Sequence, residues 1–177
     1  MFKGKYIVRA CAFAAAMFAG VAMADNVVEY SSAKYLQQQY VILKERMRPL
    51  EVVKGDDFVK VYVPSEYGFK VGQADLSRTL RDKLNDLGAY LNYYNESKIS
   101  VFGHTDSVGS YDYNKQLSKK RALAVAEQLI VGGVNPLRLS IVPESFEVPK
   151  CKEVDSVSRE CNRRVEIDIE LDPEVYR

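Results

Sequence analysis

Two charged residues, Asp106 and Arg121, offer the clearest binding chemistry in the sequence. Asp106 stands in the run TDSVG, directly after an apolar segment, and Arg121 stands on a helical pattern fifteen residues further on. A carboxylate accepts hydrogen bonds from an ammonium group, and a guanidinium binds a carboxylate through parallel hydrogen bonds. Held on a rigid frame, such a pair is a receptor for a zwitterion.

The residues around this pair predict a strand, a loop and a helix. The run Ile99, Val101 and Phe102 indicates a strand that ends near residue 104, so Asp106 falls in the loop beyond it. Ser110 precedes a pattern typical of a helix that begins there. Positions on this helix recur at spacings of three and four and predict its core-facing stripe: Asn114, Leu117, Ser118, Arg121, Val125 and Leu129. A charge at Arg121 on that stripe needs a partner.

The run TDSVGSYDYNKQLSKKRALAV resembles the binding motif of OmpA-like C-terminal domains, T-D-x2-G-x4-N-x2-L-S-x2-R-A-x2-V, and fills each defining position. The resemblance covers residues 59–171, including Phe69 and the segment NRRVE at 162–166. It implies an α/β fold (an α+β sandwich) with βαβαββ order and a mixed sheet covered by helices. Two positions depart from the family pattern: Lys70 stands where many members place an acid, and Ser145 where a glycine is usual.

The resemblance also implies a ligand, the diaminopimelate of the peptidoglycan peptide stem, bound without catalysis. Asp106 would then meet the ammonium group and Arg121 the carboxylate. The full set of candidate ligand-binding residues is Asp106, Arg121, Thr105, Asn114, Ser118 and Arg163. Taken singly, several of these residues are common turn or cap formers, and Arg121 could extend to solvent. Their joint spacing favours a site.

An enzyme is the first competing class of function. His104, Asp106 and Ser107 are the residue types of a catalytic triad, but neighbours on a strand and loop project in different directions. With one histidine and no serine elbow or metal cluster, we expect no catalytic residues, no metal and no cofactor. The near-zero net charge does not favour nucleic acid as a partner.

The first 24 residues have the pattern of a secretory signal peptide. Basic residues come first, an alanine-rich apolar run follows, and Ala22-Met23-Ala24 precedes the expected mature start at Asp25. An uncleaved anchor is the alternative, but the apolar run is short for a membrane span of about 20 residues. Cys11 does not fit a lipoprotein signal because Arg9 lies two positions before it. We therefore expect a mature chain without a transmembrane span, located in the periplasm, with outer-membrane association left open.

Cys151 and Cys161 are the cysteines of the expected mature chain. In an exported protein, such a pair most simply forms a disulfide, which would contribute about 2 to 3 kcal/mol. Two free thiols remain an alternative, and a metal site is the weakest one. We expect the pair to staple the loop at 143–161. Because it lies away from the motif along the chain, its reduction should lower the melting temperature without abolishing wall binding.

The rest of the chain predicts one domain with a helical extension. Alternation at residues 59–63 indicates the first strand, and leucines from Leu76 to Leu91 indicate a long helix. Residues 139–142 indicate a short strand, and residues 163–170 a last strand with unlike faces, in which Arg163 shares the apolar face. The expected division is an extension at 25–52, the OmpA-like domain at 53–172 and a tail at 173–177.

The extension carries an amphipathic helix at residues 33–47. Its apolar seam consists of Ala33, Leu36, Tyr40, Leu43 and Met47. The seam either packs on its own domain or binds a protein partner. Two functions therefore stay open: a wall-binding protein that anchors an envelope complex to peptidoglycan, or a structural subunit of a secretion or flagellar type of machine that mainly contacts proteins.

Overall fold

The computed structural model describes residues 32–70 and 72–171. The expected signal peptide at 1–24 and the tail at 173–177 lie outside these residues. The strands are β1 (Glu51–Lys54), β2 (Phe58–Pro64), β3 (Ser97–His104), β4 (Leu139–Ser145) and β5 (Arg164–Leu171). The helices are α1 (Ser32–Arg46), α2 (Ser65–Gly68), α3 (Arg78–Tyr93), α4 (Tyr111–Val131) and α5 (Ser156–Asn162), with a 3-10 turn at Pro136–Arg138.

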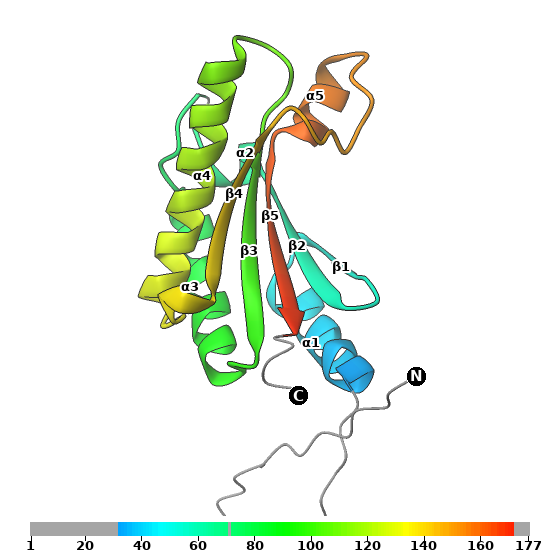
Figure 1. Cartoon of the computed structure of the whole chain (residues 1–177), viewed down its shortest axis with the longest axis vertical. Helices are drawn as coiled ribbons and strands as arrows, with labels where there is room; N and C mark the ends of the chain where they lie inside the picture. The colour runs from blue at the N-terminus through cyan, green and yellow to red at the C-terminus, as the bar shows by residue number, and fades with distance from the viewer. Residues whose placement is uncertain (1–31, 71, 172–177) are drawn as a thin grey trace, which may run out of the picture.

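The five strands form one mixed sheet in the order β1-β2-β5-β3-β4 (Figure 1). β3 and β4 are parallel, whereas the other neighbouring strands are antiparallel. β5 lies in the centre, where Ile167 pairs with Val61 on one side and Val101 on the other. The predicted mixed sheet with covering helices is confirmed.

Three elements differ from the sequence expectation. β1 is an additional edge strand, and α5 lies inside the segment expected to be a long loop. The first long helix begins at Arg78 rather than at Leu76, because Ser77 caps it by accepting a hydrogen bond from the Leu80 amide. Leu76 instead pairs with Phe69 in a short bridge before the helix.

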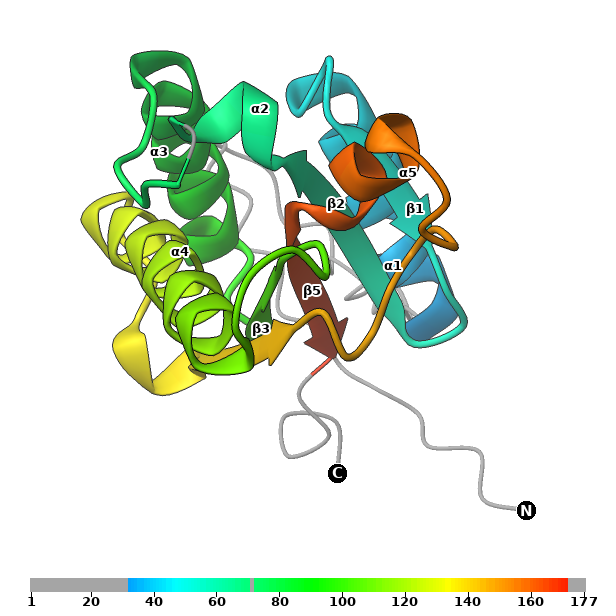
Figure 2. The ribbon, with the colours of Figure 1, turned by 90° about the horizontal axis from the view of Figure 1, so that it is seen from above.

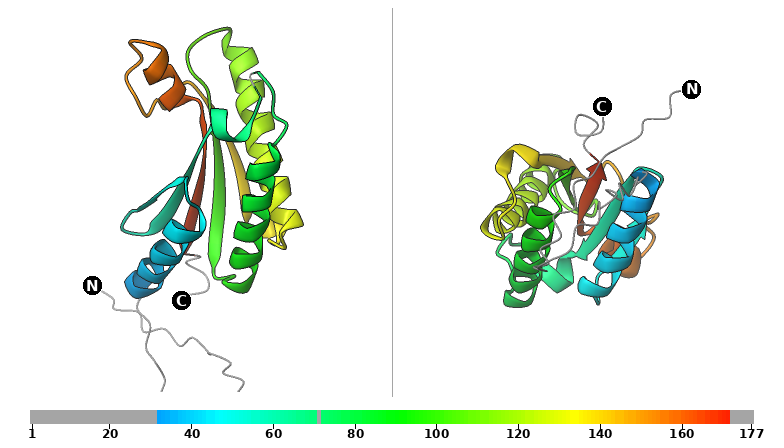
Figure 3. Two further views of the ribbon diagram at one scale, coloured as in Figure 1. Left: turned by 180° about the vertical axis from the view of Figure 1, so that it is seen from behind. Right: turned by 90° about the horizontal axis from the view of Figure 1, so that it is seen from below.

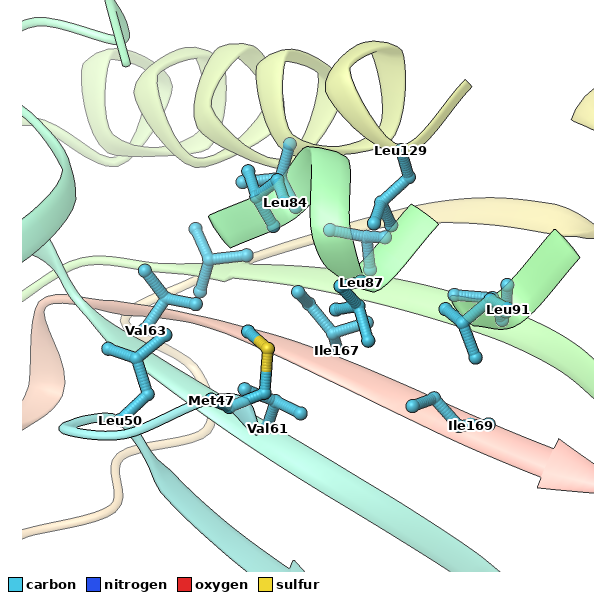
Figure 4. Close-up of a cluster of buried hydrophobic side chains, with 14 of the residues drawn as sticks. Met47, Leu50, Val61, Val63, Leu84, Leu87, Leu91, Leu129, Ile167 and Ile169 are labelled. Atoms are coloured by element: carbon cyan, nitrogen blue, oxygen red, sulfur yellow. The ribbon is translucent and has the colours of Figure 1, made fainter. Parts of the chain in front are cut away.

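The apolar core lies between one face of the sheet and the helices (Figures 2 and 3). Strand residues at alternate positions, such as Val61 and Ile167, are fully buried beneath leucines of α3. Figure 4 shows Leu84, Leu87 and Leu91 of α3 above this face, with Leu129 of α4 beside them. No helix in the described part of the chain is long and apolar enough to cross a membrane.

The helix α1 packs on the same face of the sheet. Leu36, Leu43 and Met47 are at most 2% exposed, and Figure 4 shows Met47 against Val61 and Ile167. Arg46 of α1 also forms a salt bridge of 3.0 Å with Asp86 of α3. Leu36, Leu43 and Met47 of the expected seam are therefore buried within the protein and are not available for docking to a partner.

The opposite face of β5 carries charges that compensate one another, as the predicted unlike faces require. Arg164, Glu166 and Asp168 are all buried. Arg164 donates from Nε to Glu166 at 2.7 Å, and the Lys60 ammonium on β2 lies 3.3 Å from Asp168 and contacts Glu166 as well. Buried charges need such partners because desolvation of a lone charge is costly.

We expect Leu43→Ala to lower the free energy of unfolding by about 2 to 5 kcal/mol, because it leaves a cavity between α1 and the sheet. Val41→Ala is the matched control, since Val41 is 53% exposed on the same helix, and it should change the value by less than about 0.5 kcal/mol. Urea unfolding measures both. Equal, small effects of the two variants would contradict the packing of α1 in the core.

Candidate functional site

The candidate residues gather at the edge of the sheet where β2, β3 and β4 end and β5 begins, at the top of Figure 1. The loop from Thr105 to Ser110 joins β3 to α4 there. Strand and helix approach closely at Gly103, where an added Cβ would lie 2.1 Å from the Ser118 carbonyl oxygen. This glycine therefore fixes the separation between the loop that carries Asp106 and the helix that carries Arg121.

Asp106 is held from the beginning of β5. Its Oδ2 accepts a hydrogen bond of 2.8 Å from Nη1 of Arg163, and its Oδ1 accepts one of 3.2 Å from the Val108 amide. The Asp106 side chain is 13% exposed. The predicted involvement of Arg163 at this edge thus takes the form of a direct ion pair with Asp106.

A second carboxylate, Glu66 of α2, grips the same guanidinium. Arg163 donates to Glu66 Oε1 from Nε at 2.8 Å and lies 2.6 Å from it through Nη2. Partial burial acts to lower the pKa of Arg163, but the hydrogen bonds from Arg163 to Asp106 and Glu66 raise it above its ordinary value. Sequence reasoning missed Glu66, although this carboxylate stands two residues after β2 and was a usable signal.

Arg121 is 3% exposed and is held by the segment between β2 and α3. Its Nε donates to the Gln73 carbonyl at 2.9 Å, its Nη1 donates to Ser65 Oγ at 3.0 Å, and its guanidinium lies over the Phe69 ring at 5.3 Å. Burial lowers the pKa of Arg121, and the nearby charge of Glu66 opposes this effect. An arginine stays protonated despite such a shift, so a shielded cation forms one wall of the site.

The other predicted residues shape the loop. Asn114 donates from Nδ2 to the Val108 carbonyl at 3.0 Å. Ser118 donates to the Lys115 carbonyl and accepts from the Ser145 amide at 3.3 Å. The Thr105 hydroxyl is buried and has no hydrogen-bond partner in the described residues. Asn114 and Ser118 therefore support the site, while Asp106, Arg121 and Arg163 carry its charge.

Ser145 explains one departure from the family pattern. Its φ is 54°, in the left-handed region that favours glycine. Its carbonyl accepts a hydrogen bond of 2.8 Å from the Thr105 amide, and its own amide bonds Ser118 as described above. The serine adopts the backbone turn that a glycine would adopt and keeps both contacts to the site loop. Lys70, the other departure, is exposed.

The residue types of a catalytic triad are present but do not form a relay. His104 is buried on the charged face of the sheet, with Nε2 at 3.7 Å from Glu166 Oε1. Ser107 instead contacts Glu153, and Asp106 contacts Arg163. Proton transfer needs a nucleophile and a base within hydrogen-bond reach, and these three side chains point to different partners.

The predicted disulfide between Cys151 and Cys161 is present. The loop that it closes contacts the candidate site, although its cysteines lie far from the motif along the chain. Glu153 in this loop accepts hydrogen bonds from the Ser107 amide and hydroxyl. Sequence reasoning missed Glu153, and no local pattern marks it, because its partner is distant in the sequence.

Comparisons with known proteins place this geometry in a family. The profile of the OmpA family matches residues 68–163. The Escherichia coli K12 protein named Probable lipoprotein YiaD is 29% identical over 137 residues, which cover 76% of this chain and 63% of that protein. The Peptidoglycan-associated lipoprotein of Legionella pneumophila is 33% identical over 100 residues, covering 56% and 57%. The chain thus spans less than two thirds of these relatives.

Among solved structures, a MotB-like protein from Desulfovibrio vulgaris superposes with a TM-score of 0.71. The match covers 80% of this chain and 97% of that one, at 22% sequence identity. This likeness shows that the two chains share the fold.

The environment of His104 predicts an acid-dependent loss of stability. Burial, together with the charges of Arg164 and Lys60, lowers its pKa from 6.5 to about 4, although Glu166 opposes this. Between these two values the unfolded chain binds a proton that the folded protein does not, so His104 destabilises the fold as the pH falls through that window. By pH 5 this effect amounts to about 2 kcal/mol.

Asp168 acts in the opposite direction, because burial raises its pKa from 3.8 to about 6. Between these two values the folded protein binds a proton that the unfolded chain does not, so Asp168 stabilises the fold as the pH falls. The histidine effect is therefore isolated by comparing wild type with His104→Asn. The free energy of unfolding of both proteins is measured in urea at pH 7 and pH 5. The value for the variant minus the value for wild type should be about 2 kcal/mol higher at pH 5 than at pH 7. A difference that does not change with pH would contradict the assigned environment.

Proposed function

This chain belongs to the OmpA family, and on that premise we propose that it binds cell-wall peptidoglycan without catalysis and anchors an envelope protein or complex to the wall. The ligand is the diaminopimelate of the peptide stem. A relative in the comparison carries peptidoglycan association in its name. The signal-peptide pattern at residues 1–24 directs the protein to the periplasm, where a ligand of the cell wall is accessible.

The observation that supports this proposal is the cluster of four charges at the sheet edge. Two carboxylates, Asp106 and Glu66, and two guanidiniums, Arg121 and Arg163, lie together and sum to zero. A zwitterion is neutral as well, so it can enter without leaving an uncompensated charge in a partly buried place. A ligand of one sign would leave such a charge.

Hydrogen-bond capacity remains for both ends of the ligand. A guanidinium has five N–H donors, and Arg121 uses Nε and Nη1 for its contacts with Gln73 and Ser65. The remaining donors can bind a carboxylate. Each oxygen of Asp106 has one hydrogen-bond donor and can accept another, from an ammonium group. Exposed amides at the start of α4 add positive potential for the carboxylate.

The binding strength follows from the small number of contacts. Each charge-assisted hydrogen bond contributes about 1.5 to 3 kcal/mol when it is shielded, and ordering of the ligand offsets part of this. Free diaminopimelate should therefore bind at about micromolar to millimolar concentration. The wall presents the group many times over, so avidity compensates for weak single contacts.

Docking through the seam of α1 was the basis of the alternative, a subunit that mainly contacts protein partners. Since Leu36, Leu43 and Met47 are buried against the sheet, the seam does not support a function in which the protein mainly contacts protein partners. Wall binding through the charged cluster is the function that the geometry favours.

We expect Asp106→Ala to weaken retention of the protein on purified sacculi by about ten- to a hundredfold, because one end of the ligand loses its partner. Arg121→Lys should also bind poorly, since an ammonium group cannot replace the planar fork. Pull-down with sacculi, with thermal unfolding as a check of the fold, measures both.

Glu127→Ala and Lys120→Ala are the matched controls, because both side chains are exposed on α4 and should leave retention unchanged. Folded Asp106 and Arg121 variants that pellet with sacculi as well as wild type would remove the site assignment.

A further inference from the structure

The acidic loop of the site, residues 105–110, is held at two adjacent residues by side chains of the segment 151–163, which contains the Cys151–Cys161 disulfide. Arg163 bonds the carboxylate of Asp106. Glu153 bonds the next residue, Ser107, through its amide at 3.0 Å to Oε1 and 3.3 Å to Oε2, and also through its hydroxyl. Residues 153 and 163 thus fix Asp106 and Ser107 from one side, and Asp106 is the residue that we expect to bind the ammonium group of the ligand.

Glu153 is itself held by a buried asparagine. Asn162, 1% exposed, donates from Nδ2 to Glu153 Oε1 at 3.0 Å and to the Cys151 carbonyl at 2.9 Å. Its Oδ1 accepts from the Cys151 amide at 2.8 Å. Asn162 directly follows Cys161, whose disulfide to Cys151 closes the ring. An unbroken chain of bonds therefore leads from the disulfide to Ser107.

The carboxylate of Glu153 is ionised in this position. Partial burial acts to raise its pKa, but the hydrogen bonds from Ser107 and Asn162 lower it below the ordinary value. A charged acceptor forms stronger hydrogen bonds than a neutral one. Because a loop amide has no secondary-structure partner of its own, such a bond restricts the conformations that the loop adopts.

We propose that Glu153 is a positioning residue for the acidic loop of the site, and that the Cys151–Cys161 disulfide strengthens ligand binding by holding Glu153 in place. The inference rests on the proposed function. When the ring is open, residues 151–161 gain conformational freedom, so placing Glu153 on Ser107 costs more entropy. The site then spends more of its time with Asp106 out of position, which reduces the apparent affinity.

Other contacts keep the segment on the protein when the disulfide is absent. Glu147 accepts hydrogen bonds from Tyr111 and Lys115 of α4, and Lys150 pairs with Glu51 of β1 at 2.6 Å. The effect of opening the ring is therefore local to Glu153 and Asn162. These contacts also offer a control, since the pair of Lys150 and Glu51 ties the same segment to the outer strand β1.

The test is a cycle of variants, measured by NMR titration with meso-diaminopimelate. We expect Glu153→Gln, and separately Cys151→Ser with Cys161→Ser, each to bind about 5- to 30-fold more weakly than wild type. Combining all three substitutions should weaken binding little further, because both changes remove the same constraint. Glu51→Gln should bind like wild type.

Amide hydrogen exchange of the ligand-free protein provides a second measurement beside the titration. The amide hydrogen of Ser107 should exchange faster with solvent in Glu153→Gln and in the cysteine variant than in wild type. If the disulfide has a merely structural role, the cysteine variant should have a lower unfolding midpoint, but its affinity and its exchange at Ser107 should equal those of wild type.

The outcomes separate the two proposals. Binding by Glu153→Gln equal to wild type, or losses that multiply in the combined variant, would overturn the role of Glu153 while leaving the proposed function in place. If wild type itself does not bind meso-diaminopimelate, the proposed function fails and the inferred effect on affinity fails with it. Unchanged exchange at Ser107 would then also rule out Glu153 as the residue that orders the loop.

Discussion

Burial of the Arg121 guanidinium is the constraint on which the rest of the site depends. A cation on the core-facing stripe of α4 is costly unless hydrogen bonds replace water. The segment between β2 and α3 supplies them through Gln73 and Ser65 and places the Phe69 ring beneath the charge. This arrangement holds that segment against the middle of α4, where Arg121 lies close to the charge of Asp106.

The charges around this cation are balanced before a ligand binds. Arg163 bonds both Asp106 and Glu66, so the two carboxylates are positioned before any ligand arrives. Preorganised groups lose less entropy on binding. The disulfide segment extends the same arrangement through Glu153. The site that we propose for diaminopimelate thus draws residues from helix α4 and from three connections at one end of the sheet, those that follow β2, β3 and β4.

The sequence predicts the features that depend on local pattern and fails for those that depend on tertiary contact. Periodic leucines reveal α3, alternation reveals β2 and β5, and the cysteine pair reveals the disulfide. The four-residue edge strand β1 is too short to show a pattern, and its pairing with β2 defines it. Glu66 and Glu153 become site residues only because the fold brings them to Arg163 and Ser107, 97 and 46 positions away.

The charged cluster that we propose as the binding site should recognise an ammonium group and a carboxylate together. Diaminopimelate and lysine differ in the carboxylate at the far end of the side chain. Because each free compound also carries an α-ammonium and an α-carboxylate, the test uses both compounds with the α end blocked as an acetamide and a carboxamide, so that only the side-chain end is presented. NMR titration of the wild-type protein with each compound should show meso-diaminopimelate shifting the amide signals near Asp106 and Arg121, with lysine binding at least about tenfold more weakly. Equal binding of the two compounds, or shifts confined to another surface, would contradict the account.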